Sequence, residues 1–179
     1  MKVYILGKGR GWEDAPYEKD ADVWGVTQMI LKRDCTLAID MNVYEDGRWG
    51  EKEKQEARMA KEVCLINKIP YIDLETYPYE IIRDCFKTDY FSNTVDYAIA
   101  MALYSGYDEI DLYGITMEEG SEYSYQKPGC DFWCGVAKGM GVNIRVFGQY
   151  ATLMRTRDKK VYGYDIPQQT YEEKGVLFV

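Results

Sequence analysis

Residues 92–114 constrain the fold of this chain more than any other stretch of its sequence. Small polar residues at 92–94 precede an Ala-rich apolar run, and Gly106 follows that run. Residues 109–113, three of which are hydrophobic, then lead directly to Gly114. This order is typical of a capped amphipathic helix, a glycine stop and a short buried strand. Because ligands of open α/β sheets bind beyond the carboxyl ends of the strands, the stretch predicts a site above Gly114.

The same alternation of strands and helices runs along most of the chain. Short apolar runs predict further strands at 2–6, 23–26, 35–39, 71–74 and 143–147. Patterned or capped segments predict helices at 27–32, at 49–68, at 78–86, after Ser92 or Asn93, and at 128–140. We therefore expect a single α/β domain, a Rossmann-like three-layer sandwich with a mostly parallel sheet of about five or six strands. Residues 1–150 would form it, and residues 151–179 would be a carboxyl-terminal extension that packs on it or on a second subunit.

The chain contains no histidine, which narrows its possible chemistry. Ser-His-Asp and Cys-His catalysis and His-ligated zinc are excluded, so acid–base work falls to carboxylates, Lys, Arg, Tyr, Cys or a bound cation. The five cysteines lack CxxC spacing and are expected to be structural thiols, with no protein-held metal site. A reducing cytoplasm is their natural setting.

The charge and hydropathy of the chain argue against two kinds of partner, nucleic acid and a membrane. The net charge of −8 argues against nucleic acid, because no basic stripe offsets it. No stretch of about 18 consecutive apolar residues occurs, so no membrane span is expected. A small phosphorylated ligand, held by a few Arg side chains and backbone N–H groups, remains compatible with this composition.

The first predicted strand leads into a glycine-rich loop formed by Gly7, Lys8, Gly9, Arg10 and Gly11. Glycines let the backbone approach a phosphate, and Lys8 and Arg10 supply positive charge. The loop is not the GxGxxG fingerprint, and no long helix follows it directly. A tight turn without a ligand is therefore the alternative.

Two further groups of polar residues lie at predicted strand or helix ends. Asp40 and Asn42 follow the third strand, where a carboxylate can hold a ribose hydroxyl or a divalent cation. An Asx turn or a helix cap is the alternative for this pair. Ser92, Asn93 and Thr94 offer hydroxyls and N–H groups to an anion at a helix start, and simple capping explains them equally well.

Residues 116–126 form a long polar segment after the strand at 109–113, and such loops usually carry function. Glu118 and Glu122 are its candidates for acid–base catalysis. Its candidates for ligand binding are Thr116, Tyr125 and Gln126. A solvated loop without a function is the alternative.

Several of these residues carry a resemblance to a known family. They are Ser92, Asn93, Thr94, Val95, residues 98–103, Gly106, Ile110, Leu112 and Gly114. The segment from Thr94 to Met117 resembles the Rossmann-like family that includes the motility accessory factors and archaeal 6-hydroxymethylpterin diphosphokinase. The glycine loop and the strand at 22–26 look like the same family, and bacterial sialyltransferases are a more remote likeness. Residues 120–129 and 162–164 are similar to uncharacterised proteins of tailed phages.

Two positions depart from the pattern of this family. Thr116 stands where the family has Asp, and Thr27 or Gln28 stands where it has Asn after the second strand. The resemblance implies that the chain binds a nucleotide or a similar phosphorylated small molecule for phosphoryl or glycosyl transfer.

In this hypothesis each candidate group has a role. Residues 7–11 and 92–94 would hold phosphates, and Asp40 would position a sugar hydroxyl or Mg²⁺. Glu118 or Glu122 would act as base, since a carboxylate with a raised pKa can replace histidine as proton acceptor. No other cofactor is indicated.

The alternative hypothesis is a phage protein that sequesters a nucleotide signal of host defence without catalysis. Thr116 in place of Asp and the 17 tyrosines favour binding over turnover, because tyrosine rings can stack on bases. The tyrosines, the four tryptophans and the apolar end at 176–179 also predict a homodimer.

Overall fold

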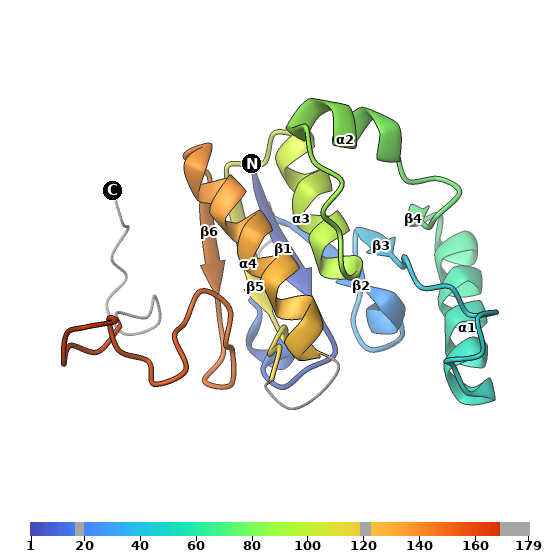
Figure 1. Ribbon diagram of the computed structural model, residues 1–179. Helices are drawn as coiled ribbons and strands as arrows, with labels where there is room; N and C mark the ends of the chain where they lie inside the picture. The colour runs from blue at the N-terminus through green and yellow to red at the C-terminus, as the bar shows by residue number, and fades with distance from the viewer. Residues whose placement is uncertain (17–19, 119–122, 169–179) are drawn as a thin grey trace.

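The computed structural model describes residues 1–16, 20–118 and 123–168, and Figure 1 shows their arrangement. Six strands form one sheet in the order β4-β3-β2-β1-β5-β6, and all neighbouring strands are parallel. They are β1 (Lys2–Leu6), β2 (Asp22–Val26), β3 (Leu37–Ile39), β4 (Tyr71–Ile72), β5 (Glu109–Tyr113) and β6 (Asn143–Val146). The predicted Rossmann-like α/β fold with a parallel sheet is confirmed.

Helices cover both faces of the sheet. They are α1 (Glu51–Asn67), α2 (Tyr79–Phe86), α3 (Thr94–Tyr104), α4 (Tyr123–Gly139) and the 3₁₀ helices η1 (Trp12–Asp14) and η2 (Thr27–Leu31). In Figure 1, α3 and α4 lie side by side across one face, and the main core forms beneath them. On the other face, Ala60 and Cys64 of α1 pack with Ile30 and Ala38. The expected three layers are therefore present.

Strand β1 in the middle of the sheet explains why a core forms on both of its faces. Val3 and Ile5 of β1 point into the core beneath α3 and α4, whereas Tyr4 and Leu6 point to the opposite face. Side chains of a strand alternate between faces, so a strand in the middle of a sheet must be apolar on both. Strand β5 lies between β1 and β6 and departs from this rule at Asp111, which is buried and paired with Arg145 of β6 at 2.6 Å.

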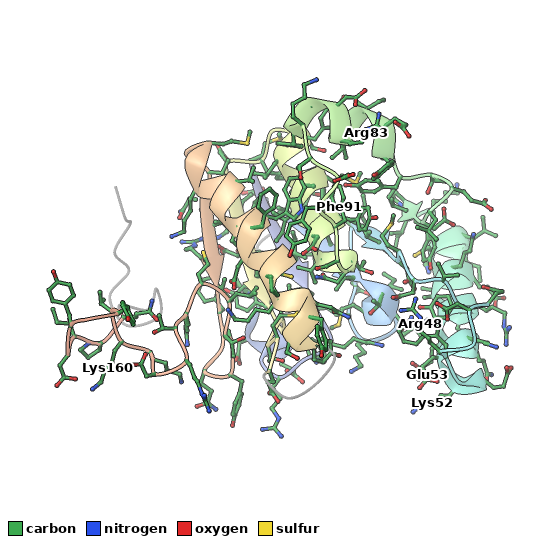
Figure 2. All side chains as sticks on the ribbon, viewed as in Figure 1. Arg48, Lys52, Glu53, Arg83, Phe91 and Lys160 are labelled. Atoms are coloured by element: carbon green, nitrogen blue, oxygen red, sulfur yellow. The ribbon has the colours of Figure 1, made fainter. Side chains whose placement is uncertain are left out.

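Helix α3 begins where the sequence predicts. The Asn93 side chain accepts hydrogen bonds from the N–H groups of Val95 at 2.8 Å and Asp96 at 3.3 Å, which caps the helix. Gly106, with φ of 80°, follows the last turn in the left-handed conformation that favours glycine. Figure 2 shows Phe91 just before this helix, and its ring stacks on Tyr97 at 4.3 Å.

The predicted start of α4 is wrong. The segment 114–127 was expected to be a loop before a helix that begins at Pro128, but α4 begins at Tyr123 and contains Pro128. The first four N–H groups of a helix lack intrahelical partners, so a proline near the start removes few bonds. Because Pro128 is the sixth residue of α4, the helical hydrogen bond that it removes is the one to the Ser124 carbonyl.

The start of the predicted carboxyl-terminal extension packs on the domain. Ala151 and Leu153 are buried in the main core. Beyond them the chain forms an arm that contains one isolated bridge, between Lys160 and Pro167, and Figure 2 shows Lys160 on it away from the sheet. The apolar end at 176–179 lies outside the described residues, and the homodimer stays a prediction.

Four of the five cysteines, Cys35, Cys64, Cys130 and Cys134, are buried and unpaired, whereas Cys85 is exposed on α2. Burial raises the pKa of each of these four thiols, which keeps them protonated and unreactive. In the part of the chain that the structure describes, no helix is long and apolar enough to cross a membrane.

Candidate active site at the carboxyl edge of the sheet

The order of the strands reverses between β1 and β5. The chain moves outward from β1 through β2 and β3 to β4, and then returns to the other side of β1 to form β5 and β6. Such a reversal opens a crevice at the carboxyl ends of the strands, which is where ligands of this fold class bind. The loops after β1 and β5 both lie at this edge.

These two loops pack backbone against backbone. The N–H groups of Gly7 and Gly9 donate to the carbonyls of Tyr113 and Gly114, each at 2.8 Å. A Cβ atom on either Gly7 or Gly9 would lie 2.6 Å from the Gly114 oxygen. Both glycines are therefore required for close packing of the loops. Their N–H groups, which were predicted to bind a phosphate, already have acceptors in the protein.

The rest of the glycine loop remains open to a ligand. Among the residues that the structure describes, the N–H groups of Lys8, Arg10 and Gly11 have no hydrogen-bond acceptor. Lys8 and Arg10 are exposed, and the Arg10 guanidinium lies over the Tyr150 ring at 4.9 Å. The loop thus keeps three N–H groups and two positive charges at the sheet edge.

Asp40 lies at the end of β3 and is the centre of a buried polar network. Its side chain is 3% exposed and accepts hydrogen bonds from Asn42 and Tyr44. The Asn42 N–H lies 3.2 Å from Oδ1, which is the predicted Asx turn, and the Asn42 amide donates to the same oxygen at 2.7 Å. The Tyr44 hydroxyl donates to Oδ2 at 2.6 Å, and the Tyr71 hydroxyl lies 3.5 Å from it.

Gln28 completes this network, and sequence reasoning did not identify it as a site residue. Its Nε2 donates to Asp40 Oδ2 at 3.2 Å and to the Tyr44 hydroxyl, and its Oε1 accepts from Lys8 Nζ at 2.6 Å. Gln28 is 4% exposed between the apolar residues Val26 and Met29. Two signals were available: a polar residue within an apolar segment at a strand end, and a position at or next to the Asn of the family that the chain resembles.

The environment of Asp40 limits what its carboxylate can do. Burial raises the pKa of Asp40, although hydrogen bonds from Tyr44, Asn42 and Gln28 oppose the shift. A carboxylate offers about four lone-pair positions, and these donors fill them. Asp40 therefore holds its neighbours in place and has no free position for Mg²⁺ or for a substrate hydroxyl, contrary to its predicted role.

The described residues contain no group of three acidic or cysteine side chains that could hold a metal ion.

A cleft of about 470 Å³ lies beside this network, between the ends of β3 and β4 and helix α1. Asn42, Tyr44 and Tyr71 line one side of it, and Lys54, Arg58 and Lys61 of α1 line the other. Desolvation and the nearby Asp40 raise the pKa of Tyr44 and Tyr71, so both hydroxyls remain protonated at neutral pH. Four acidic residues, Asp40, Glu45, Asp73 and Glu75, also line the cleft, and Lys61 is paired with Asp73 at 2.9 Å. The cleft therefore combines neutral hydrogen-bonding groups with charges of both signs.

The start of α3 is occupied by groups of the protein itself. Asp96 is fully buried and accepts hydrogen bonds from the Ser92 N–H at 2.7 Å, the Ser92 hydroxyl at 2.8 Å and the Asn93 amide at 3.1 Å. The Thr94 hydroxyl accepts from the Met41 N–H at 3.4 Å. The Asp96 carboxylate takes the place that an anion would fill, so capping, and not phosphate binding, describes Ser92, Asn93 and Thr94.

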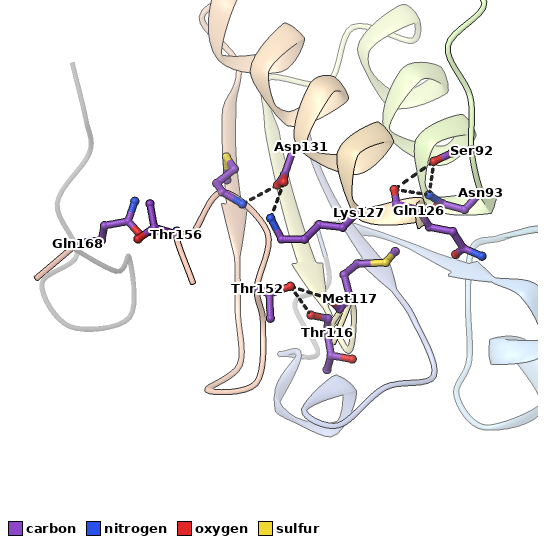
Figure 3. A network of polar contacts seen from close by, with 11 residues as sticks. Ser92, Asn93, Thr116, Met117, Gln126, Lys127, Asp131, Thr152, Thr156 and Gln168 are labelled. Carbon is purple, nitrogen blue, oxygen red and sulfur yellow. Dashed lines mark hydrogen bonds and ion pairs between the residues drawn. The ribbon is translucent and has the colours of Figure 1, made fainter. Parts of the chain in front are cut away.

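The structure does bring the predicted residues of α3 and α4 together, as Figure 3 shows. The Gln126 carbonyl accepts from the Ser92 hydroxyl at 3.0 Å and from the Asn93 amide at 3.3 Å. Gln126 thus joins the two helix starts through its backbone. Tyr125, on the first turn of α4, is 86% exposed.

The remaining candidates lie on the β5 loop. The Thr116 carbonyl accepts hydrogen bonds from the Thr152 N–H and hydroxyl, at 3.1 and 3.0 Å, which fixes the loop to the chain after β6 (Figure 3). The Thr116 methyl group would lie 3.1 Å from a Cβ at Gly9, beside the glycine loop. Glu118 is exposed, whereas Glu119 and Glu122 lie outside the described residues.

Comparisons with known proteins leave the ligand open. No family model and no curated protein matches the chain. The sialyltransferase CstII from Campylobacter jejuni, in complex with the substrate analogue CMP-3FNeuAc, is similar at 13% identity and a TM-score of 0.41, over 81% of this chain and 79% of that chain. Its complex with cytidine-5'-monophosphate gives 14% identity and a TM-score of 0.40, over 85% and 81%. Likeness at this level carries no argument about activity, and the resemblance to motility accessory factors stays a prediction.

Proposed function

We propose that this protein binds a nucleotide or a similar phosphorylated small molecule at the carboxyl edge of its sheet, for phosphoryl or glycosyl transfer. The observation that carries the proposal is the continuous network from Lys8 through Gln28 to Asp40 and Tyr44. It joins an exposed cation on the glycine loop to hydrogen-bonding groups at the cleft. A ligand that carries both a phosphate and a neutral polar group could contact the cation with the first and the hydrogen-bonding groups with the second.

The phosphate is placed at the glycine loop. Lys8 and Arg10 supply charge there, and the N–H groups of Lys8, Arg10 and Gly11 supply donors. The rest of the ligand lies toward Asn42 and Tyr44, whose amide and hydroxyl groups suit a sugar or a base. Glu118 remains the proposed base, because Asp40 has no free lone pair.

The test uses a panel of nucleoside phosphates and nucleotide sugars, each with and without Mg²⁺. Binding is measured as a shift of the unfolding temperature, and the ligand is then analysed by ³¹P NMR. We expect at least one compound to stabilise the protein and to be converted to product. A ligand that stabilises the protein and is recovered unchanged would instead support the non-catalytic, sequestering protein.

Two lysine variants make the test specific. Lys8→Met removes the proposed phosphate contact, whereas Lys52→Met removes the same charge from an exposed position near the start of α1, where Figure 2 shows Lys52. Loss of a charged hydrogen bond to phosphate is expected to weaken binding by about 1.5–3 kcal/mol in Lys8→Met only. No stabilisation by any compound, or equal losses in both variants, would refute the proposal.

A further inference from the structure

Gln28 lies between two charged groups, and this fixes the orientation of its amide. Lys8 Nζ donates to Oε1 at 2.6 Å, and Nε2 donates to Asp40 Oδ2 at 3.2 Å. A flipped amide would turn its NH₂ group toward the ammonium and its oxygen toward the carboxylate, and both contacts would become repulsive. The position of the Lys8 side chain is therefore linked to Asp40 through a buried residue.

The backbone before Gln28 supports a special role for this position. Thr27, at the end of β2, has a φ of 57°, which is unusual for a β-branched residue. Gln28 itself departs from helical geometry within η2, with φ of −89° and ψ of 25°. Strained backbone of this kind persists where the surrounding structure requires it. The side chain that follows this turn is buried and contacts Lys8 and Asp40.

We infer that Gln28 is a positioning residue that holds the Lys8 ammonium at the glycine loop for the phosphate of the ligand. The phosphate part of this inference rests on the proposed function. An exposed lysine samples many rotamers, and fixing it in advance lowers the entropy lost when a ligand binds. The ammonium has three donors, and since Gln28 uses one of them, two remain for phosphate oxygens.

Because Gln28 acts through Lys8, its effect on phosphate binding must disappear when Lys8 is absent. The probe is inorganic pyrophosphate, and its dissociation constant is measured by calorimetry for the wild type, Lys8→Met, Gln28→Met and the double variant. We expect a loss of about tenfold for Lys8→Met, as for one charged hydrogen bond, and of about threefold or more for Gln28→Met. In the Lys8→Met background, Gln28→Met should change the constant by less than about twofold.

Arg10→Met provides the matched control. Arg10 belongs to the same loop, but its guanidinium lies over Tyr150 and not against Gln28. The losses of Arg10→Met and Gln28→Met should therefore multiply in their double variant. Equal losses for Gln28→Met with and without Lys8 would overturn the inference.

A second measurement needs no ligand. In a ¹H–¹⁵N NMR spectrum of the lysine ammonium groups, the Lys8 signal is assigned with Lys8→Met. We expect Gln28→Met to move this signal to the position typical of solvated lysines. An unchanged Lys8 signal in Gln28→Met would overturn the inference.

The two experiments separate the possible failures. If the wild type binds neither pyrophosphate nor any nucleotide, the proposed function fails, and the phosphate part of the inference fails with it. The ammonium spectrum then decides on its own whether Gln28 positions Lys8.

Discussion

Two of the three glycines of helix α4, Gly129 and Gly135, should respond in opposite ways to the same substitution. A Cβ atom on Gly129 would collide with Ser92 Oγ and Asp96 Oδ2, whereas a Cβ on Gly135 meets nothing within 4 Å. Alanine is favoured over glycine inside a helix by about 0.5–1 kcal/mol, and this gain applies at both positions. We therefore expect Gly135→Ala to raise the free energy of unfolding by about that amount.

Gly129→Ala has an additional cost. Asp96 is fully buried and holds the Ser92 N–H at 2.7 Å, so its oxygen cannot move away without loss of hydrogen bonds. Overpacking costs about 1–3 kcal/mol, and each hydrogen bond to a charged group contributes about 1.5–3 kcal/mol. We expect Gly129→Ala to be less stable than Gly135→Ala by about 3 kcal/mol.

Urea unfolding, followed by circular dichroism with linear extrapolation, measures this difference. The slope of the transition should be the same in both variants, since the surface exposed on unfolding does not change. If Gly129→Ala proves as stable as Gly135→Ala, the described packing of α4 on the start of α3 is incorrect.

Three further predictions concern the glycine loop, Asp40 and the assembly. Gly9→Ala should lower the free energy of unfolding by about 1–3 kcal/mol in urea, because its Cβ meets the Gly114 carbonyl at 2.6 Å; wild-type stability would contradict this. In a ¹³C NMR titration, Asp40 should titrate above the ordinary aspartate pKa of 3.8 because burial disfavours its charge. Since the folded state then binds this proton more tightly than the unfolded state, protonation of Asp40 stabilises the folded protein. This stabilisation is complete below pH 3.8 and is lost as the pH rises through the folded pKa. A pKa below 3.8 would contradict the burial argument. Light scattering at micromolar concentration should give a dimeric mass, which deletion from Tyr171 onward should reduce, and a monomeric mass for the intact chain would end that prediction.

The elements that sequence predicts best are those whose limits have a local cause. Strands β1 and β5 have the predicted bounds, because each is a short segment with apolar residues on it and a glycine directly after it. The start of α3 follows from the capping side chain of Asn93. The start of α4 could not be found in the same way, because Pro128 was interpreted as the first helical residue and is the sixth. A proline near a helix start is compatible with both positions.

The site shows the same division between local and distant contacts. The Asx turn of Asp40 and Asn42 depends on residues two apart, and sequence predicts it as an alternative. The contact of Lys8 with Gln28 joins residues twenty apart, and only the parallel pairing of β1 and β2 brings them together. For the same reason, sequence could not show that the Gly9 N–H donates to the Gly114 carbonyl. Nor could it show that the Asp96 carboxylate accepts the hydrogen bonds at the start of α3.

The central claim is that a phosphorylated ligand binds along the network from Lys8 to Tyr44. A ¹H–¹⁵N NMR titration of the wild-type protein, with the nucleotide that stabilises it most, tests this claim most directly. We predict that the largest shifts fall on the amides of residues 8–11, 27–28 and 40–44, and that Lys8→Met strongly reduces them. Shifts confined to other parts of the chain, or their complete absence, would contradict it.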